Sequence, residues 1–246
     1  MIKKHIPNII TCLNLFSGCI ALAVAFNDDL ATAAIFIGVA AVFDFLDGMS
    51  ARLLKVKSNI GKELDSLADV VSFGVVPGVI VFILLQNSAG NFQPVFFGYG
   101  ILSYTGFLIP VFSAIRLAKF NLDERQSDSF IGVPTPAIAM LIGSLPLILW
   151  QIGCAYSGIF IFIKQIINSP YFLIPLTMVL SLLLVSELPL FAMKFKNLRW
   201  KDNKIRFIFL GISVVFIIIF QFIAIPLIIF LYILLSIIGM KREKRG

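Results

Sequence analysis

Charged residues are scarce in this chain, and long polar segments are almost missing. Asp, Glu, Lys and Arg together make up 13% of its 246 residues, whereas hydrophobic residues make up 59%. A typical soluble domain contains about 25% charged residues. The longest polar stretch, residues 121–129, is too short to fold on its own. The composition therefore excludes an ordinary soluble globular protein and indicates no separate soluble domain.

Histidine and cysteine are equally rare. The single histidine, His5, lies in the basic N-terminal flank, where we expect it near lipid headgroups. The three cysteines, Cys12, Cys19 and Cys154, do not have the spacing of metal ligands. Zinc sites and disulfide frameworks need such residues in close, regular groups. The sequence therefore argues against both, and we expect the cysteines to be small buried apolar side chains.

Apolar sequence, by contrast, is abundant. The mean hydropathy is +1.01, and apolar runs long enough to cross a bilayer recur along the chain. We expect one all-α, polytopic membrane domain over residues 1–246. Its eight transmembrane helices are predicted at residues 8–26, 30–54, 61–86, 94–118, 134–153, 170–190, 205–221 and 224–240. Residues 155–169 are expected at the membrane interface, and the first run is expected to be a retained helix, since no small-residue cleavage site stands out.

The basic residues predict the orientation of these helices. In this arrangement all but one of the 20 Lys and Arg residues fall on the same side of the membrane, and the exception is Lys164. Because cytoplasmic loops are enriched in Lys and Arg, we expect both termini in the cytosol and the protein in the cytoplasmic (inner) membrane. The net charge of +7 then reflects this topology and contact with anionic membrane lipids, so nucleic-acid binding is not needed to explain it.

Four aspartates stand out against this apolar background. Asp44 and Asp47 share a face near the end of the second predicted helix, and Asp65 and Asp69 share a face near the start of the third. Both pairs lie roughly 12–15 Å from the turn between the helices, so antiparallel packing would bring the four carboxylates together near the cytosolic face. Carboxylates in a membrane need a partner, and hard oxygen donors suit divalent cations. The sequence therefore predicts one or two Mg²⁺ or Mn²⁺ ions.

Small residues and an arginine accompany the aspartates. Gly48 and Ala51 follow Asp47, and Gly61 begins the third helix, so each leaves space for a bulky anion near the backbone. The planar guanidinium of Arg52 suits a diphosphate. These residues predict a site for a diphosphate-bearing substrate. Two alternatives stay open: a lone intramembrane aspartate can be a proton relay or pair helices, and small residues can simply pack helices.

The spacing of these residues resembles the motif D-x2-D-G-x2-A-R-x8-G-x3-D-x3-D of the CDP-alcohol phosphatidyltransferase family. All eight fixed positions are present: Asp44, Asp47, Gly48, Ala51, Arg52, Gly61, Asp65 and Asp69. The resemblance implies a six-helix core, here about residues 6–190, with two additional helices at about 205–240. It also implies a CDP-linked donor, an alcohol acceptor, release of CMP and a homodimer. The four aspartates would hold the metal, and Asp69 would also be the catalytic general base.

Three further stretches, residues 6–18, 113–121 and 130–137, resemble the phosphatidylserine synthase branch of this family. The resemblance implies CDP-diacylglycerol as donor and L-serine as acceptor. Asn8 and Thr11 are candidates for contact with the CDP group, although Asn8 could equally cap the first helix.

The same branch supplies candidates for binding the acceptor. They are Arg116, Lys119, Asn121 and Thr135. Arg116 or Lys119 could hold the serine carboxylate, or either could anchor the protein to lipid headgroups. Asn121 could instead end a helix, and Thr135 could merely precede one. Two other functions stay open. The first is a related synthase of the same family with another acceptor, such as glycerol 3-phosphate, inositol phosphate or a second lipid, or an archaetidylserine-type synthase. The second is cation-coupled transport.

Overall fold

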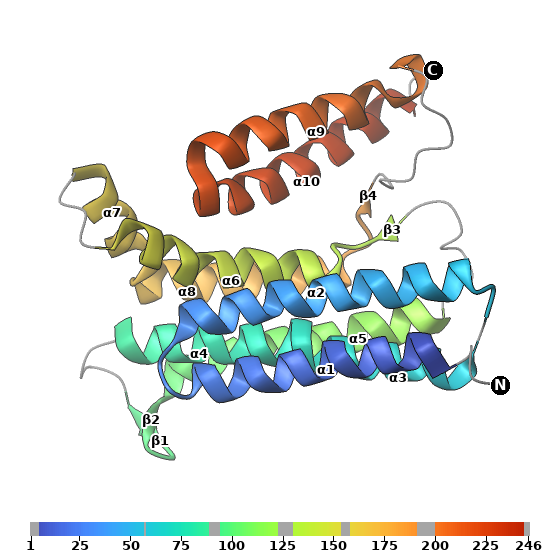
Figure 1. Ribbon diagram of the computed structural model, residues 1–246. Coiled ribbons are helices and arrows are strands. Elements are labelled where there is room, and N and C mark those ends of the chain that lie inside the picture. Colours follow the sequence, from blue (N-terminus) through green and yellow to red (C-terminus); the bar gives the residue numbers. More distant parts are fainter. Residues whose placement is uncertain are drawn as a thin grey trace.

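The computed structural model describes residues 5–56, 58–88, 94–122, 130–153, 158–190 and 200–243, and it is almost entirely helical over them (Figure 1). In chain order the elements are α1 (His5–Ala25), α2 (Leu30–Leu53), α3 (Asn59–Asp69), η2 (Val70–Val75), α4 (Val76–Ser88), β1 (Val95–Phe96), β2 (Tyr99–Gly100), η4 (Ile101–Phe107), α5 (Leu108–Leu122), β3 (Phe130–Ile131), α6 (Thr135–Ile152), α7 (Gly158–Ile167), α8 (Pro170–Val185), β4 (Pro189–Leu190), α9 (Trp200–Phe220), η5 (Gln221–Ile223) and α10 (Ala224–Glu243).

The prediction of an all-α membrane bundle is confirmed, but the number of candidate membrane-spanning stretches differs from the eight helices expected. Within the described residues, six stretches are long and apolar enough to span a membrane: His5–Ala25, Leu30–Leu53, Asn59–Ser88, Ile101–Leu122, Thr135–Ile152 and Arg206–Ser236. A seventh is formed if α7 and α8, bent by 60°, count as one span. The prediction of eight divides Arg206–Ser236 into two helices. The described chain does turn there, because Gln221 has a φ of 51° and the rings of Phe209 and Tyr232 lie 5.8 Å apart.

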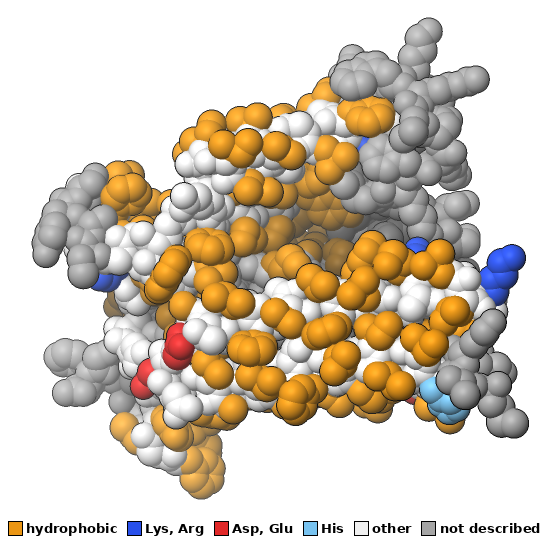
Figure 2. Space-filling model, in the orientation of Figure 1, with side chains coloured by type: hydrophobic (Ala, Val, Ile, Leu, Met, Phe, Trp, Pro, Cys, Tyr) orange, Lys and Arg blue, Asp and Glu red, His pale blue; other side chains and the backbone are white. Residues whose placement is uncertain are grey.

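The centre of the bundle is α4. Its residues from Val76 to Leu85 are all buried, as expected for a helix that is apolar on every side. α1 and α2 pack against each other, and α1 also contacts α3, η2 and α4. Hydrophobic side chains cover the outer face of α1 and α2 along their length (Figure 2). This surface suits contact with lipid tails, so the aspartates of α2 and α3 lie in a predominantly apolar frame.

Two boundaries differ from those expected. Residues 94–100 were assigned to a helix, but they form the β1–β2 hairpin, with Val95 opposite Gly100. The turn requires positive φ at Phe97 and Gly98, which glycine adopts readily. At the other end of the core, the expected helix to residue 190 stops at Val185. The chain there continues into β4, which pairs antiparallel with β3.

The expected burial of the cysteines is wrong for Cys12 and Cys19, which are both exposed on α1. An apolar side chain on the outside of a membrane bundle can face lipid tails, so it does not need to be inside the protein. Cys154 lies outside the described residues, as do several predicted cytosolic cations, including Lys3, Lys4, Lys57 and Arg125. His5 is exposed at the start of α1, as its predicted place in the N-terminal flank requires.

Candidate metal centre and substrate pocket

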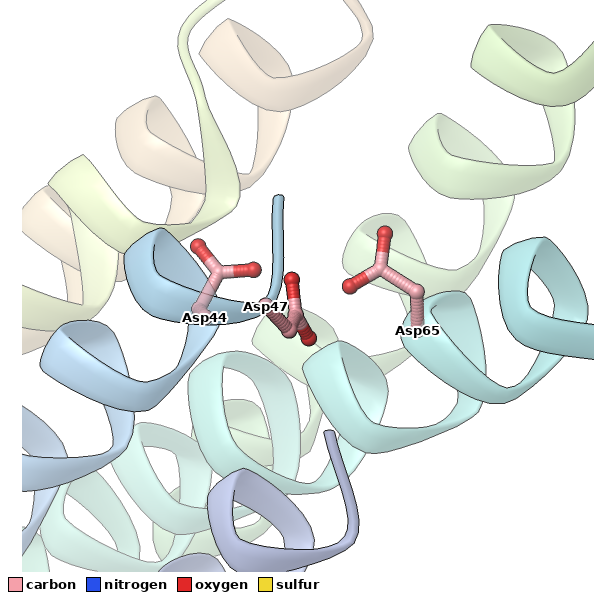
Figure 3. Close-up of side chains that lie close together, drawn as sticks. All are labelled: Asp44, Asp47 and Asp65. Atoms are coloured by element: carbon pink, nitrogen blue, oxygen red, sulfur yellow. The ribbon is translucent and has the colours of Figure 1, made fainter. Parts of the chain in front are cut away.

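Three of the four predicted metal ligands converge between α2 and α3 (Figure 3). One carboxylate oxygen from each of Asp44, Asp47 and Asp65 lies within 4.8 Å of the other two. Sequence spacing predicted that α2 and α3 would bring these side chains together by packing on each other, but the two helices instead meet through α1, against which both pack. Asp69 was predicted to be a fourth ligand, but it does not belong to this group.

The donor set fits a hard divalent cation. All three groups are carboxylates, the donors that Mg²⁺, Mn²⁺ and Ca²⁺ prefer. Asp47 is 7% exposed, and Asp65 Oδ1 is buried with no hydrogen-bond partner among the described residues. A buried carboxylate oxygen without a donor is costly, and repulsion among three close carboxylates adds to that cost. A bound cation would remove both costs.

A pocket of about 360 Å³ opens beside this cluster. It is lined by Pro7, Asn8, Thr11, Asp47, Gly48, Ala51, Val56, Ser58, Asn59, Gly61, Lys62 and Asp65. Every residue predicted to contact the CDP group is on this wall except Arg52. That side chain is exposed, and its Nε donates to the backbone oxygen of Gly48 at 2.9 Å. The wall instead includes a cation that the sequence argument missed, Lys62.

The two glycines of the motif have different surroundings. At Gly48 a Cβ would have only Arg52 Nη2, 4.0 Å away, as a close neighbour, so the space beside its backbone is open. At Gly61 a Cβ would lie 2.8 Å from Asn8 Oδ1. Gly61 therefore lets α1 approach α3, and the space that it leaves is occupied by Asn8. Because Asn8 lies inside α1, the alternative that it caps this helix is wrong.

Polar side chains of α1 hold two of the aspartates. Thr11 Oγ1 lies 2.6 Å from Asp47 Oδ2 and 3.0 Å from the backbone oxygen of Pro7. A hydroxyl has one proton, so we assign it to the closer, charged acceptor. One turn later, Asn14 Nδ2 donates to Asp69 Oδ1 at 3.3 Å. Sequence reasoning gave Asn14 no role, although a polar residue in an apolar membrane helix was a signal.

The acceptor candidates fall into two groups. Arg116 is 7% exposed, its guanidinium interacts electrostatically with Asp69, and its Nη1 donates to Oγ1 of the buried Thr135 at 3.5 Å. This burial contradicts the alternative that Arg116 anchors lipid headgroups. Lys119 is exposed. Asn121 joins α5 to α3, because its Nδ2 donates to Ser66 Oγ at 2.8 Å and its backbone oxygen accepts from Lys62 Nζ at 2.9 Å.

Comparison with known proteins gives this arrangement a context. A protein named CDP-diacylglycerol–serine O-phosphatidyltransferase from Helicobacter pylori is 37% identical over 138 residues, which are 55% of this chain and 54% of the relative. One of the same name from Bacillus subtilis is 34% identical over 140 residues, which are 56% of this chain and 73% of the relative. An archaetidylserine synthase from Methanothermobacter thermautotrophicus is 33% identical over 141 residues, 56% of each chain.

These matches cover only part of the chain and of its relatives. The chain spans about half the length of the Helicobacter pylori relative, and the aligned part is 138 residues long. The sequence profile of the CDP-alcohol phosphatidyltransferase family matches residues 4–169, which contain α1 to α7 and the whole aspartate cluster. The chain therefore belongs to the CDP-alcohol phosphatidyltransferase family.

Proposed function

We propose that this chain transfers the phosphatidyl group of CDP-diacylglycerol to the hydroxyl of L-serine, which yields phosphatidylserine and CMP. The observation that carries the proposal is the convergence of Asp44, Asp47 and Asp65 beside a pocket of about 360 Å³, within the usual size of a ligand site. The names of the bacterial relatives support serine as the acceptor.

In this proposal the three clustered carboxylates hold Mg²⁺ or Mn²⁺. A divalent cation bound there would offset the charge of the diphosphate and act as a Lewis acid on its oxygens. Gly48 and Ala51 leave room for the diphosphate against α2. Lys62 on the pocket wall and the neighbouring Arg52 supply positive charge, and Asn8 offers a polar contact to the cytidine part of the donor.

Asp69 is the proposed general base. It accepts the proton of the serine hydroxyl while the serine oxygen forms a bond to the phosphatidyl phosphorus. The bond between that phosphorus and the oxygen of CMP breaks, and CMP leaves with the electron pair. Asp69 lies outside the three-carboxylate group, and a carboxylate has two acceptor oxygens, so an oxygen of Asp69 is available for the proton.

The proposed partner of the serine carboxylate is Arg116. It is a buried cation close enough to Asp69 for electrostatic attraction, and its Nε has no hydrogen-bond partner among the described residues. A guanidinium can hold a carboxylate through two parallel hydrogen bonds. Thr135 would help to orient the guanidinium. Lys119, which is exposed, is better suited to lipid headgroups.

The proposal includes a place in the cell and an assembly. The exposed cations Arg52, Lys55, Lys62 and Lys119 lie near the site, which supports a cytosolic orientation in the cytoplasmic membrane. A homodimer is proposed from the family resemblance. The archaeal relative supports a second candidate with the same acceptor but an archaetidyl donor.

The decisive experiment measures CMP release by the purified protein from CDP-diacylglycerol with Mn²⁺ or Mg²⁺, comparing L-serine, glycerol 3-phosphate and inositol phosphate. We expect release with serine, its loss on chelation of the metal, and a decrease of about 100-fold or more in Asp69→Asn, which cannot accept the proton. Release with a different acceptor would overturn the choice of serine. If no acceptor supported release, the archaetidyl donor of the second candidate would become the better hypothesis, and it would be tested with serine.

A further inference from the structure

Asn14 is a fully buried amide in the middle of an apolar helix, and it is not one of the eight motif positions. Its Nδ2 donates to Oδ1 of Asp69 at 3.3 Å, which links α1 to the end of α3. Its own Oδ1 is buried with no hydrogen-bond partner among the described residues. An unpaired buried oxygen is costly. The amide nevertheless directs its N–H groups to the carboxylate, so the contact with Asp69 governs its orientation.

The backbone around Asp69 is fixed to the same helix. Ser72 lies in the π-helix η2, which begins at the residue after Asp69, and its Oγ donates to the backbone oxygen of Asn14 at 3.1 Å. A Cβ at Gly18 would lie 2.5 Å from this Oγ, so only glycine allows so close an approach of α1 and η2. π-Helical segments are frequent at functional sites. Both the side chain and the backbone of Asp69 are therefore positioned from α1.

The second carboxylate oxygen of Asp69, Oδ2, has different surroundings. The like charges of Asp44 and Asp65 act on Asp69, while Arg116 attracts it from α5. No side chain in the described part of the protein donates a hydrogen bond to Oδ2. Because Oδ1 accepts the hydrogen bond from Asn14, Oδ2 is the oxygen with its full acceptor capacity left for a proton.

We propose that Asn14 is a positioning residue, which holds Oδ1 of Asp69 and thereby aims Oδ2 at the acceptor hydroxyl. The inference rests on the proposed function, in which Asp69 is the general base. It assigns Asn14 no contact with either substrate. A loss of Asn14 should therefore slow the chemical step and leave the binding of substrates and metal nearly unchanged.

The test compares wild-type protein with Asn14→Leu, which has a branched side chain but no donor, in the CMP-release assay. The matched control is Ser17→Ala on the same helix, because Ser17 Oγ donates to the backbone oxygen of Leu13 at 2.8 Å. We expect kcat to fall about 10- to 100-fold in Asn14→Leu, as for a misplaced base. The KM values for both substrates and the Mn²⁺ affinity should change by less than about threefold. Ser17→Ala should stay within about twofold of the wild type in every parameter.

A kcat within about twofold of the wild type in Asn14→Leu would overturn the inference. A variant with a lower kcat, higher KM values and a lower Mn²⁺ affinity would also overturn it, because that combination indicates a general structural role. If this variant does not fold, Asn14→Ala is used, because it removes the amide donor without adding a titratable group; wild-type kcat there overturns the inference equally. Wild-type activity is the separate control on the function. Without CMP release from the wild type with serine both proposals fail, whereas normal wild-type activity with an unaffected Asn14→Leu removes only this one.

Discussion

A guanidinium group buried in a membrane protein needs an anionic partner, because an unpaired charge removed from water is costly. The contacts of the Arg116 guanidinium within the protein include no hydrogen-bonded anion among the described residues. Thr135 accepts one hydrogen bond of 3.5 Å, and the ring of Phe120 lies 6.0 Å from the guanidinium carbon. Asp69 provides an attractive charge without a hydrogen bond among the described residues. The unused donor capacity suits a carboxylate that enters with the acceptor.

Replacing Arg116 should therefore affect the acceptor much more than the donor. We expect Arg116→Gln to raise the KM for L-serine about 10- to 100-fold. This increase corresponds to the loss of a hydrogen bond to a charged group, which contributes about 1.5–3 kcal/mol. The KM for CDP-diacylglycerol should change little, since Arg116 is not on the pocket wall. Lys119→Gln, an exposed cation three residues further on, is the control and should leave both KM values near those of the wild type. Equal increases for donor and acceptor would contradict this role for Arg116.

At the residue scale, spacing predicts which residues gather but not which atoms meet. The intervals between Asp44, Asp47 and Asp65 predicted a shared site, because helix periodicity puts Asp44 and Asp47 on one face and the turn between the helices returns Asp65 to a similar depth. The intervals could not predict that Asp69 is held separately by Asn14, because that contact depends on how α1 crosses α3. For the same reason, Gly61 was assigned to nucleotide space, although its missing side chain makes room for Asn8.

At the scale of elements, the stretch Asn59–Ser88 explains how the site is built. It runs as α3, η2 and α4 without a break, close to the predicted helix at residues 61–86. Ser58 caps its start by accepting a hydrogen bond from the backbone N–H of Gly61 at 3.2 Å. Hydropathy located this helix well. The π-helical turn in its middle was not predictable, because it is coupled to contacts of Ser72 and Gly74 with α1 and α5 and not to a local pattern.

The crossing of α1 and α3 gives a prediction at this scale. Gly61→Ala should force the Asn8 side chain away from α3 at the pocket wall, at a cost of about 1 kcal/mol for overpacking. Gly38→Ala is the matched control, because a Cβ there meets nothing within 4 Å, and alanine is favoured in a helix by about 1 kcal/mol. In detergent, Gly61→Ala should melt several degrees below Gly38→Ala, at about 2–4 °C per kcal/mol. It should also raise the KM for CDP-diacylglycerol. Equal melting temperatures would mean that Asn8 moves aside freely.

For the whole molecule, the C-terminal hairpin of α9 and α10 is joined to the core near its turn. Gln151 at the end of α6 accepts a hydrogen bond from the backbone N–H of Phe222 at 2.9 Å and donates to the backbone oxygen of Phe220 at 3.3 Å. The family profile ends at residue 169, so it does not cover this hairpin. Hydropathy predicted both helices. Their arrangement beside the core depends on these polar contacts and on the packing of α10 against α6 and β4, which no periodicity encodes.

The proposed orientation of the molecule rests on charge alone, so it can be tested without substrate. Lys55 lies after α2 at the aspartate end of the bundle, and Phe97 lies in the β1–β2 hairpin at the opposite end (Figure 1). If the excess of Lys and Arg faces the cytosol, then Phe97 is outside. In a background without Cys12, Cys19 and Cys154, a membrane-impermeant maleimide should label Phe97→Cys in intact spheroplasts, and Lys55→Cys only after the membrane is opened. The reverse pattern would place the aspartates on the outer face and contradict the proposed orientation.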